Sequence, residues 1–436
     1  MAVTGDAGGQ GCIIAREGEF VKMFAFRTEM WYIVPSVARH HGQRSLHRGY
    51  QERGWGDKAV SESVAAITDL EQHMAALSAE DREVFDRIFH VQTATGDLVV
   101  PDTMRQWVIN AFGSVEAVRH QRIVKVTNLI LLEGALFNPL RGVRPVELAS
   151  PGDVLATIEG TRGGPFCHPE ELTPGDVFGD PEDDQASGRI RGKHCVTASN
   201  IAKCDGYHGL VIFDEHNPLI ITKERVHDYV DTALRWAKRA HNADAQARYF
   251  FLMWNCLWKG GASIIHGHMQ VTLGRGMHYA RIEHCRRQAM LYRLAHGTNF
   301  FDDLYRTHAA LGLAAKIGQT RVFASLTPVK EKEIWLISPS CWIDNEDFKD
   351  CLGTVLQAYV GALGVKSFNL VLYQRPIDVP EYGARHWEDW DGFPAIVRLV
   401  DRGDLQTLTT DVGCMELYGS SVVATDPFAV IKALTG

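Results

Sequence analysis

Polar and apolar residues alternate without exception over one stretch beyond the middle of the chain. From Ile265 to Val271, small or apolar residues hold the odd positions, and His266, His268 and Gln270 hold the even ones. Successive side chains of a β-strand point to opposite faces, so this period of two predicts a strand with three polar groups on one face. The other face is predicted to pack into a core.

A turn of small residues is predicted immediately before this strand, from Gly260 to Ser263. Because no bulky side chain stands in the way, the backbone N–H groups of such a turn can approach an anion closely. Two imidazoles and an amide beside an anion-binding turn suit phosphoryl or nucleotidyl transfer. A neutral imidazole can attack phosphorus and hold it as a covalent phosphoramidate, which divides one difficult step into two.

The amide of Gln270 can donate hydrogen bonds to phosphate oxygens where charge develops. A third histidine at this position could protonate a leaving group, but glutamine cannot, which argues against simple hydrolysis. The alternative interpretations are a buried strand with incidental histidines and a metal-binding pair without chemistry. The glycine turn and the histidine spacing together favour the chemical interpretation.

The remaining pattern predicts a protein of mixed helices and strands. Helical spacing of apolar residues is found over 65–91, 222–242, 279–296 and 348–364. Ser78 and Thr222, each followed by acidic residues, are predicted N-caps. Strand-like runs cover 123–132, 250–257, 319–326, 333–338 and 367–374, with two more inside 192–213.

Composition narrows the class of protein. The 436 residues allow two or three domains or one large duplicated fold, and the hydrophobic and charged contents of 45% and 22% are ordinary for a globular protein. A net charge of −8 provides no general basic surface, which argues against broad nucleic-acid binding. The sequence contains no apolar run long enough for a membrane span. Nine scattered cysteines fit reduced thiols, so we expect a cytoplasmic location.

The glycine turn and the His-x-His-x-Gln strand resemble the active-site segment of the galactose-1-phosphate uridylyltransferase (GalT) branch of the histidine-triad (HIT) superfamily. That branch transfers a nucleotidyl group through a nucleotidyl-histidine. The resemblance implies that His268 is the nucleophile, Gln270 the phosphate-binding amide, and Ser263 a phosphate contact, with Gly261 in the turn and Asn255 upstream of it. The family usually has proline where Ile265 and Gly267 stand here, which implies a less rigid backbone.

Three further segments extend the resemblance to substrate contacts. Arg141 and Arg144 match an arginine-rich segment that meets nucleotide phosphates, for which arginine forks are well suited. Asn200 matches an asparagine that binds the nucleoside, and Glu416 matches a glutamate that contacts hexose hydroxyls. The alternatives are solvated surface arginines and ordinary turn chemistry for Asn200. Met415 replaces the family's tyrosine, which puts galactose in doubt as the sugar.

A zinc site is implied by the segment Gly164-Pro165-Phe166-Cys167, which resembles the family's Cys-Pro-Phe-Cys knuckle with glycine in place of the first cysteine. The resemblance adds His216 and His266, so Cys167 and these two histidines supply three of the four ligands of a closed structural zinc. Cys195, Cys204 or His168 are candidates for the fourth. The missing cysteine favours a lost or weakened site over an intact one.

The implied architecture is an α+β, HIT-like fold of two tandem halves with antiparallel sheets and an N-terminal extension. We expect the extension over 1–122, the catalytic half over 123–275, and a second half with the substrate-binding C-terminal segment over 276–436. The second half lacks a His-x-His pair, so the iron site of some relatives is not expected. A homodimer is implied by the resemblance alone.

These expectations define one main hypothesis and two alternatives. The main hypothesis is a nucleotidyltransferase that moves a nucleoside monophosphate between a nucleotide sugar and a phosphorylated small molecule, through His268 with the help of His266, Gln270 and Ser263. The first alternative is a phosphorylase that acts on a nucleotide sugar or a dinucleotide and uses inorganic phosphate as the acceptor. The second is a nucleotide-binding module without catalysis.

Overall fold

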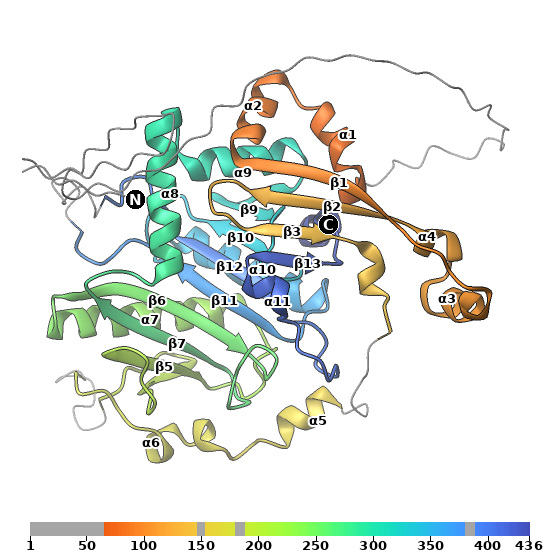
Figure 1. Ribbon diagram of the computed structural model, residues 1–436. Coiled ribbons are helices and arrows are strands. Elements are labelled where there is room, and N and C mark those ends of the chain that lie inside the picture. The colour runs from red at the N-terminus through yellow and green to blue at the C-terminus, as the bar shows by residue number, and fades with distance from the viewer. Residues whose placement is uncertain (1–64, 146–152, 179–187, 380–388) are drawn as a thin grey trace, which may run out of the picture. The chain divides into compact units, whose positions relative to one another are not determined.

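Most strands of the described chain join one long antiparallel sheet. The structure, a computed structural model, describes residues 65–145, 153–178, 188–379 and 389–436, so the first 64 residues of the expected extension lie outside it. The strands of this sheet run in the order β4-β5-β7-β6-β11-β12-β10-β9-β8 (Figure 1). Their bounds are β4 Cys195–Ser199, β5 Tyr207–Phe213, β6 Ala247–Cys256, β7 His268–Arg275, β8 Ala314–Ile317, β9 Thr320–Ala324, β10 Ile334–Ile337, β11 Phe368–Tyr373 and β12 Ile396–Asp401.

The pairing of β6 with β11 joins the strands of the two expected halves. These two strands are antiparallel, with Cys256 opposite Phe368, so one hydrogen-bonded sheet runs through both halves. The α+β class and the antiparallel pairing are as predicted. The expected boundary at residues 275 and 276 lies at the end of β7, and the one at 122 and 123 lies inside β2 (His120–Asn128). The division into three parts stays a prediction.

Helices α7 (Lys223–Ala243) and α10 (Glu346–Gly361) lie behind the sheet in Figure 1. The predicted N-cap of α7 is confirmed, because Thr222 Oγ1 accepts a hydrogen bond from the Arg225 N–H at 3.2 Å. Trp236 of α7 is fully buried against Gly209 of β5, where an added Cβ would come within 2.7 Å of the indole. Gly209 therefore allows the helix to pack closely onto the sheet.

Further helices follow β7, lie near the C-terminus or precede β4. After β7 come α8 (Ala280–His296) and α9 (Phe300–Ala310), and near the C-terminus α11 (Cys414–Leu417) and α12 (Pro427–Thr435). Short helical turns precede β4: η3 Pro139–Gly142, α5 Val154–Glu159, η4 Pro165–Cys167 and α6 Pro169–Leu172. No helix in the described ranges is long and apolar enough to cross a membrane.

A second, four-stranded sheet has the order β1-β2-β3-β13, with β1 Phe89–Asp97, β3 Gly134–Phe137 and β13 Ser420–Val423. Strand β13 pairs with β3 in parallel, so residues near the C-terminus complete a sheet begun far earlier in the chain. The helix predicted over 65–91 is divided into η1 Ile67–Asp69, α1 Leu70–Ala75 and α2 Ala79–Ile88. Ser78 caps α2 as predicted, accepting the Asp81 N–H at 3.1 Å.

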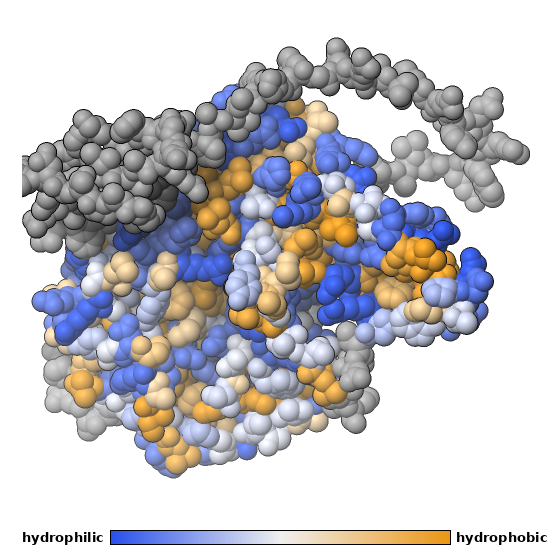
Figure 2. Space-filling model, in the orientation of Figure 1, coloured by the Kyte–Doolittle hydropathy of each residue, from blue (hydrophilic) through white to orange (hydrophobic). Residues whose placement is uncertain are grey.

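The connection between β1 and β2 exposes a group of apolar side chains. It contains η2 (Asp102–Met104), α3 (Arg105–Phe112) and α4 (Val115–Arg119). Val99 and Trp107 are 86% and 51% exposed, and Figure 2 shows an apolar patch over α3 and α4. Periodicity alone could not locate this patch, because the helices have few buried residues.

A buried ion network connects the two sheets. Arg398 of β12 donates two hydrogen bonds to Glu133, at 2.9 and 3.0 Å, and Glu133 lies in the turn between β2 and β3. The Arg398 Nε also donates to Glu333 at 2.6 Å, and the guanidinium lies 4.3 Å from the Trp335 ring centroid. Burial alone would lower the pKa of Arg398, but the carboxylates of Glu133 and Glu333 raise it.

Removal of this guanidinium is expected to destabilise the protein strongly. Arg398→Met leaves two carboxylates buried without their main partner, which typically costs about 3–5 kcal/mol. Chemical denaturation measures the change in the free energy of unfolding. As a control, Arg82→Met breaks an exposed ion pair to Asp86, for which a loss below about 1 kcal/mol is expected. Equal effects of the two substitutions would contradict a joining role for Arg398.

Candidate active site

Strand β7 displays His268 and Gln270 on the same face of the nine-stranded sheet. His268 lies opposite Ile212 and Gln270 opposite Leu210, and residues directly opposite in an antiparallel pair share a face. Phe166 covers this face, with its ring edge-on to His268 at a centroid distance of 5.0 Å. The predicted alternation therefore holds from position 268 onwards. The predicted strand starts too early, because β7 begins at His268 and His266 lies in the connection before it.

The backbone determines which nitrogen of His268 carries the proton. Its Nδ1 lies 2.8 Å from the carbonyl oxygen of His266. A carbonyl oxygen can only accept, so Nδ1 carries the proton and Nε2 keeps a free lone pair. Burial lowers the pKa of His268, which favours the neutral ring. The arrangement provides a neutral imidazole with a nucleophilic nitrogen.

Gly267, between the two histidines, forms backbone hydrogen bonds through both its N–H and its carbonyl group. Its N–H donates to the His216 carbonyl at 3.1 Å, and its carbonyl accepts from the Phe213 N–H at 2.9 Å. An added Cβ would lie 2.4 Å from the Phe213 ring and 2.8 Å from the Glu215 carbonyl oxygen. The family resemblance implied a less rigid backbone here, and in the structure both backbone groups of Gly267 are hydrogen-bonded. Proline at this position would remove the N–H donor.

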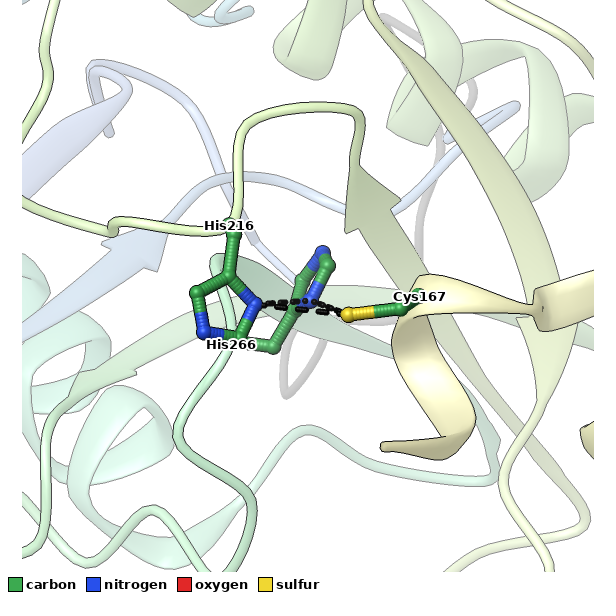
Figure 3. A group of neighbouring side chains, drawn as sticks. All are labelled: Cys167, His216 and His266. Carbon is green, nitrogen blue, oxygen red and sulfur yellow. Dashed lines mark hydrogen bonds between the residues drawn. The ribbon is translucent and has the colours of Figure 1, made fainter. Parts of the chain in front are cut away.

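Cys167, His216 and His266 lie together, as the family resemblance implied (Figure 3). The two Nδ1 atoms lie 3.0 Å apart, and the Cys167 Sγ lies 3.4 and 3.5 Å from them. Each Nε2 donates to a backbone carbonyl: that of His216 to Ile158 at 2.8 Å, and that of His266 to Phe213 at 2.9 Å. In neutral rings both Nδ1 lone pairs therefore face each other and the sulfur.

This donor set fits a divalent metal ion of the zinc type. Burial lowers the pKa of His266 to about 4, with the nearby His216 acting in the same direction, so the ring is neutral and ready to coordinate. Tetrahedral zinc bound at ~2.0 Å to nitrogen and ~2.3 Å to sulfur would separate its ligand atoms by roughly 3.3–3.6 Å, close to the spacing found. The Gly163 N–H donates to the Cys167 sulfur at 3.3 Å, as suits a thiolate.

Among the described residues, this group contains three ligand residues and no fourth. Of the predicted candidates, Cys195 lies beside the Asp228 carboxylate and Cys204 beside His208. Gly164 stands in the position of the absent cysteine, in extended backbone with φ −69° and ψ 177°. The three donor residues line a cavity of about 540 Å³. The remaining wall is both apolar and charged and includes Phe166, Val196, Ile212, Arg162, Arg191 and Lys193.

The glycine turn is attached to the second half of the chain. Asn369 of β11 donates to the side-chain oxygen of Asn255 at 2.7 Å and to the carbonyl oxygen of Gly260 at 2.6 Å. Gly261 has a φ of +92°, a conformation that strongly favours glycine, and Ser263 is exposed at the end of the turn. Asn369 thus connects the turn to β11, a contact that no pattern in the sequence indicated.

The predicted substrate contacts Glu416, Arg141 and Arg144 lie outside the histidine strand. Glu416 lines a cavity of about 210 Å³ together with Asn369, and its carboxylate accepts the backbone N–H groups of Gly413 and Val422. Asn369 is two strands from β7, about 10 Å at ordinary strand spacing. Arg141 and Arg144 are exposed, and within the described ranges neither forms a hydrogen bond or ion pair with the histidine strand.

Asn200 lies beside a histidine that the sequence did not single out. Its Oδ1 accepts the Ala202 N–H at 2.9 Å, and its Nδ2 lies 3.1 Å from Nε2 of His208. The same His208 Nε2 lies 2.9 Å from Oε1 of Gln270. His208 and Gln270 are 62 positions apart in the sequence, so no local pattern connects them. The only signal for His208 was the alternation of side chains along β5, which places it on the same face as Leu210.

The sheets, the helices and the place of the histidine strand give the chain an α+β, HIT-like fold. In fold the chain is similar to an ADP-glucose phosphorylase from Arabidopsis thaliana, with 16% identity, a TM-score of 0.51 and coverage of 71% of this chain and 97% of that chain. The predicted resemblance to GalT-like proteins is thereby confirmed for the fold. Other similar structures are a uridylyltransferase (14% identity, TM-score 0.46, coverage 59% and 86%) and yeast Ap4A phosphorylase with bound Ap4A (15%, 0.31, 77% and 97%). No protein-family model and no curated protein sequence matches the chain.

Substitutions at Gly267 test whether its close packing supports the site. Gly267→Ala is expected to lower the free energy of unfolding by about 1–3 kcal/mol, because the added methyl overlaps Phe213. Gly267→Pro should cost more, since it also removes a hydrogen bond. Gly206→Ala is the matched control, because its Cβ would meet nothing within 4 Å. Urea denaturation measures all three, and a neutral Gly267→Ala would contradict the packing described.

Proposed function

We propose that the protein is a nucleotidyltransferase that works through a covalent nucleotidyl-histidine at His268. The observation that supports this most directly is the hydrogen bond from His268 Nδ1 to the His266 carbonyl, which leaves Nε2 free as a nucleophile. The likeness to ADP-glucose phosphorylase in fold agrees with the proposal. The donor would be a nucleotide sugar or a related nucleoside diphosphate compound.

In the first step, the His268 Nε2 lone pair attacks the α-phosphorus of the donor. An N–P bond forms, and the bond from that phosphorus to the bridging oxygen breaks. The leaving group departs as a phosphate ester whose oxygen carries the electron pair. A phosphate leaving group needs no proton to depart, which is consistent with glutamine rather than an acid at position 270. The Gln270 amide and the backbone of the glycine turn would hold the oxygens of the pentavalent phosphorus.

In the second step, a phosphate oxygen of the acceptor attacks the same phosphorus and releases His268. A sugar phosphate as acceptor makes the protein a transferase, and inorganic phosphate makes it a phosphorylase. The histidine chemistry is the same for both. The cavity of about 540 Å³ next to His266 has room for a nucleotide, with Phe166, Val196 and Ile212 as its apolar wall. His268 and Gln270 do not line this cavity, so the α-phosphorus would lie at its edge. Arg162, Arg191 and Lys193 of the wall pair with Glu159, Glu170 and Glu224, and each would exchange that partner for phosphate.

We further propose that Cys167, His216 and His266 bind zinc. When bound, the ion would fix the loop that carries Cys167 and Phe166 to the strand that carries the nucleophile. With three protein ligands, the fourth position would face the cavity. His266 would thus bind the metal through its ring and accept the hydrogen bond of His268 Nδ1 through its carbonyl oxygen.

Intact-protein mass spectrometry tests the covalent route. After incubation with a panel of nucleotide sugars and dinucleotides, the protein should gain the mass of one nucleotidyl group, and His268→Ala should gain none. His120→Ala, an exposed histidine of β2, is the control and should form the adduct normally. Adding sugar phosphates or inorganic phosphate then identifies the acceptor that removes the group. Nucleotide binding without any adduct would instead identify a binding module.

Cobalt substitution tests the metal group independently of catalysis. The protein should bind one equivalent of Co²⁺ with a sulfur-to-metal absorption band. Cys167→Ser should lose that band and weaken binding at least ~10-fold, whereas Cys414→Ser, an exposed cysteine outside the group, should not. Gly164→Cys should tighten binding by supplying a fourth ligand. A band unchanged in Cys167→Ser would contradict the assignment.

A further inference from the structure

His208 has no role in the proposed chemistry so far, yet it touches the residue that would hold the phosphate. It lies on β5, 3% exposed, directly opposite Thr272 of β7. His208 and Leu210 are two positions apart, so both side chains point to the face that carries Gln270. Gln270 is thus the diagonal neighbour of His208 across the strand pair.

The backbone assigns the proton of this histidine as it does for His268. The Cys204 N–H donates to Nδ1 of His208 at 3.1 Å. A backbone N–H can only donate, so Nδ1 carries a lone pair and the proton of the neutral ring is on Nε2. Burial lowers the pKa of His208, which keeps the ring neutral around pH 7.

The Nε2 proton determines which way the Gln270 amide faces. Nε2 lies 2.9 Å from Gln270 Oε1, and an N–H needs an acceptor there. The nearby Asn200 Nδ2 is itself a donor, because the Asn200 oxygen already accepts the Ala202 N–H. Gln270 Oε1 is therefore the acceptor, and the two N–H groups of its amide are left for another partner.

The loop that supplies the Cys204 N–H is held in place by separate contacts. The Lys203 ammonium donates to Ser199 Oγ at 2.6 Å and to the His208 carbonyl at 2.9 Å. These bonds tie the connection between β4 and β5 to both strands. The orientation of the imidazole thus follows from fixed backbone groups rather than from a free rotamer.

We propose that His208 is a positioning residue that fixes the Gln270 amide with its oxygen toward the imidazole and its N–H groups toward the phosphate bound at His268. The inference depends on the proposed nucleotidyl transfer. Asn200 Nδ2 already approaches the same Nε2 as a donor at 3.1 Å, so Gln270 supplies the acceptor of this proton. The opposite orientation of the Gln270 amide would place a second N–H against the Nε2 proton, and an amide oxygen against phosphate oxygens. His208 therefore excludes the orientation that would repel the developing charge.

The test compares single-turnover rates of adduct formation at His268. His208→Phe keeps the ring shape but removes the donor, and is expected to slow adduct formation about 10- to 100-fold with little change in nucleotide affinity. His208→Gln, whose amide N–H can reach the place of Nε2, should recover much of the rate. In a Gln270→Ala background, His208→Phe should cause little further loss, because the amide it positions is gone.

A buried histidine elsewhere serves as the matched control. His308 is also buried, with Nδ1 bonded to the Leu304 carbonyl and Nε2 accepting the Leu326 N–H, far from β7 in sequence. His308→Phe should leave the rate of adduct formation unchanged in the folded protein. Equal losses in His308→Phe and His208→Phe, or additive losses with Gln270→Ala, would overturn the positioning role.

Failure of the proposed function has a different signature, since the unmodified protein would then form no adduct with any donor. The proton assignment is tested in that case by imidazole ¹⁵N spectra of the labelled protein. His208 should show the Nε2–H tautomer, and Gln270→Ala should shift its Nε2 signal. A Nδ1–H tautomer, or no response to Gln270→Ala, would overturn the inference on its own.

Discussion

The candidate site depends on backbone groups that decide where its histidines carry their protons. Carbonyl oxygens of His266, Phe213 and Ile158 accept from His268, His266 and His216, and the Cys204 N–H donates to His208. Backbone groups cannot exchange donor and acceptor roles, so each ring has one available state while neutral. The free lone pair of His268 Nε2, the paired Nδ1 lone pairs of His216 and His266, and the donor to Gln270 all follow from the positions of these backbone groups.

The position of the His266 carbonyl also explains why glycine is needed at position 267, between the two histidines. Position 267 passes so close to Phe213 and Glu215 that a side chain would displace one of them. If the chain moved there, the carbonyl of His266 would move away from His268 Nδ1. The second half of the protein contributes in a comparable way, although it has no His-x-His pair. Asn369 holds the glycine turn, and Arg398 ties the sheet to Glu133.

The sequence was most informative where a short period or a local cap decides the structure. Alternation placed His268 and Gln270 on one face, and Ser78 and Thr222 begin helices as predicted. The resemblance to a family brought together Cys167, His216 and His266, which no local pattern could connect. Contacts between distant segments, such as His208 with Gln270 and Glu133 with Arg398, were beyond prediction. They depend on the order of strands in the sheet, and one sequence does not determine that order.

The parallel pairing of β13 with β3 has a consequence for how the chain folds. Strand β13 follows all nine strands of the long sheet in the chain, so its contact with β3 closes a very long loop and has a high entropic cost. Until then the edge of β3 is unpaired, and exposed strand edges promote association between chains. Synthesis would therefore pass through a stage at which the histidine strand exists while Glu416, just before β13, is still absent from its cavity. The cavity that Glu416 lines would therefore be among the last features of the structure to form.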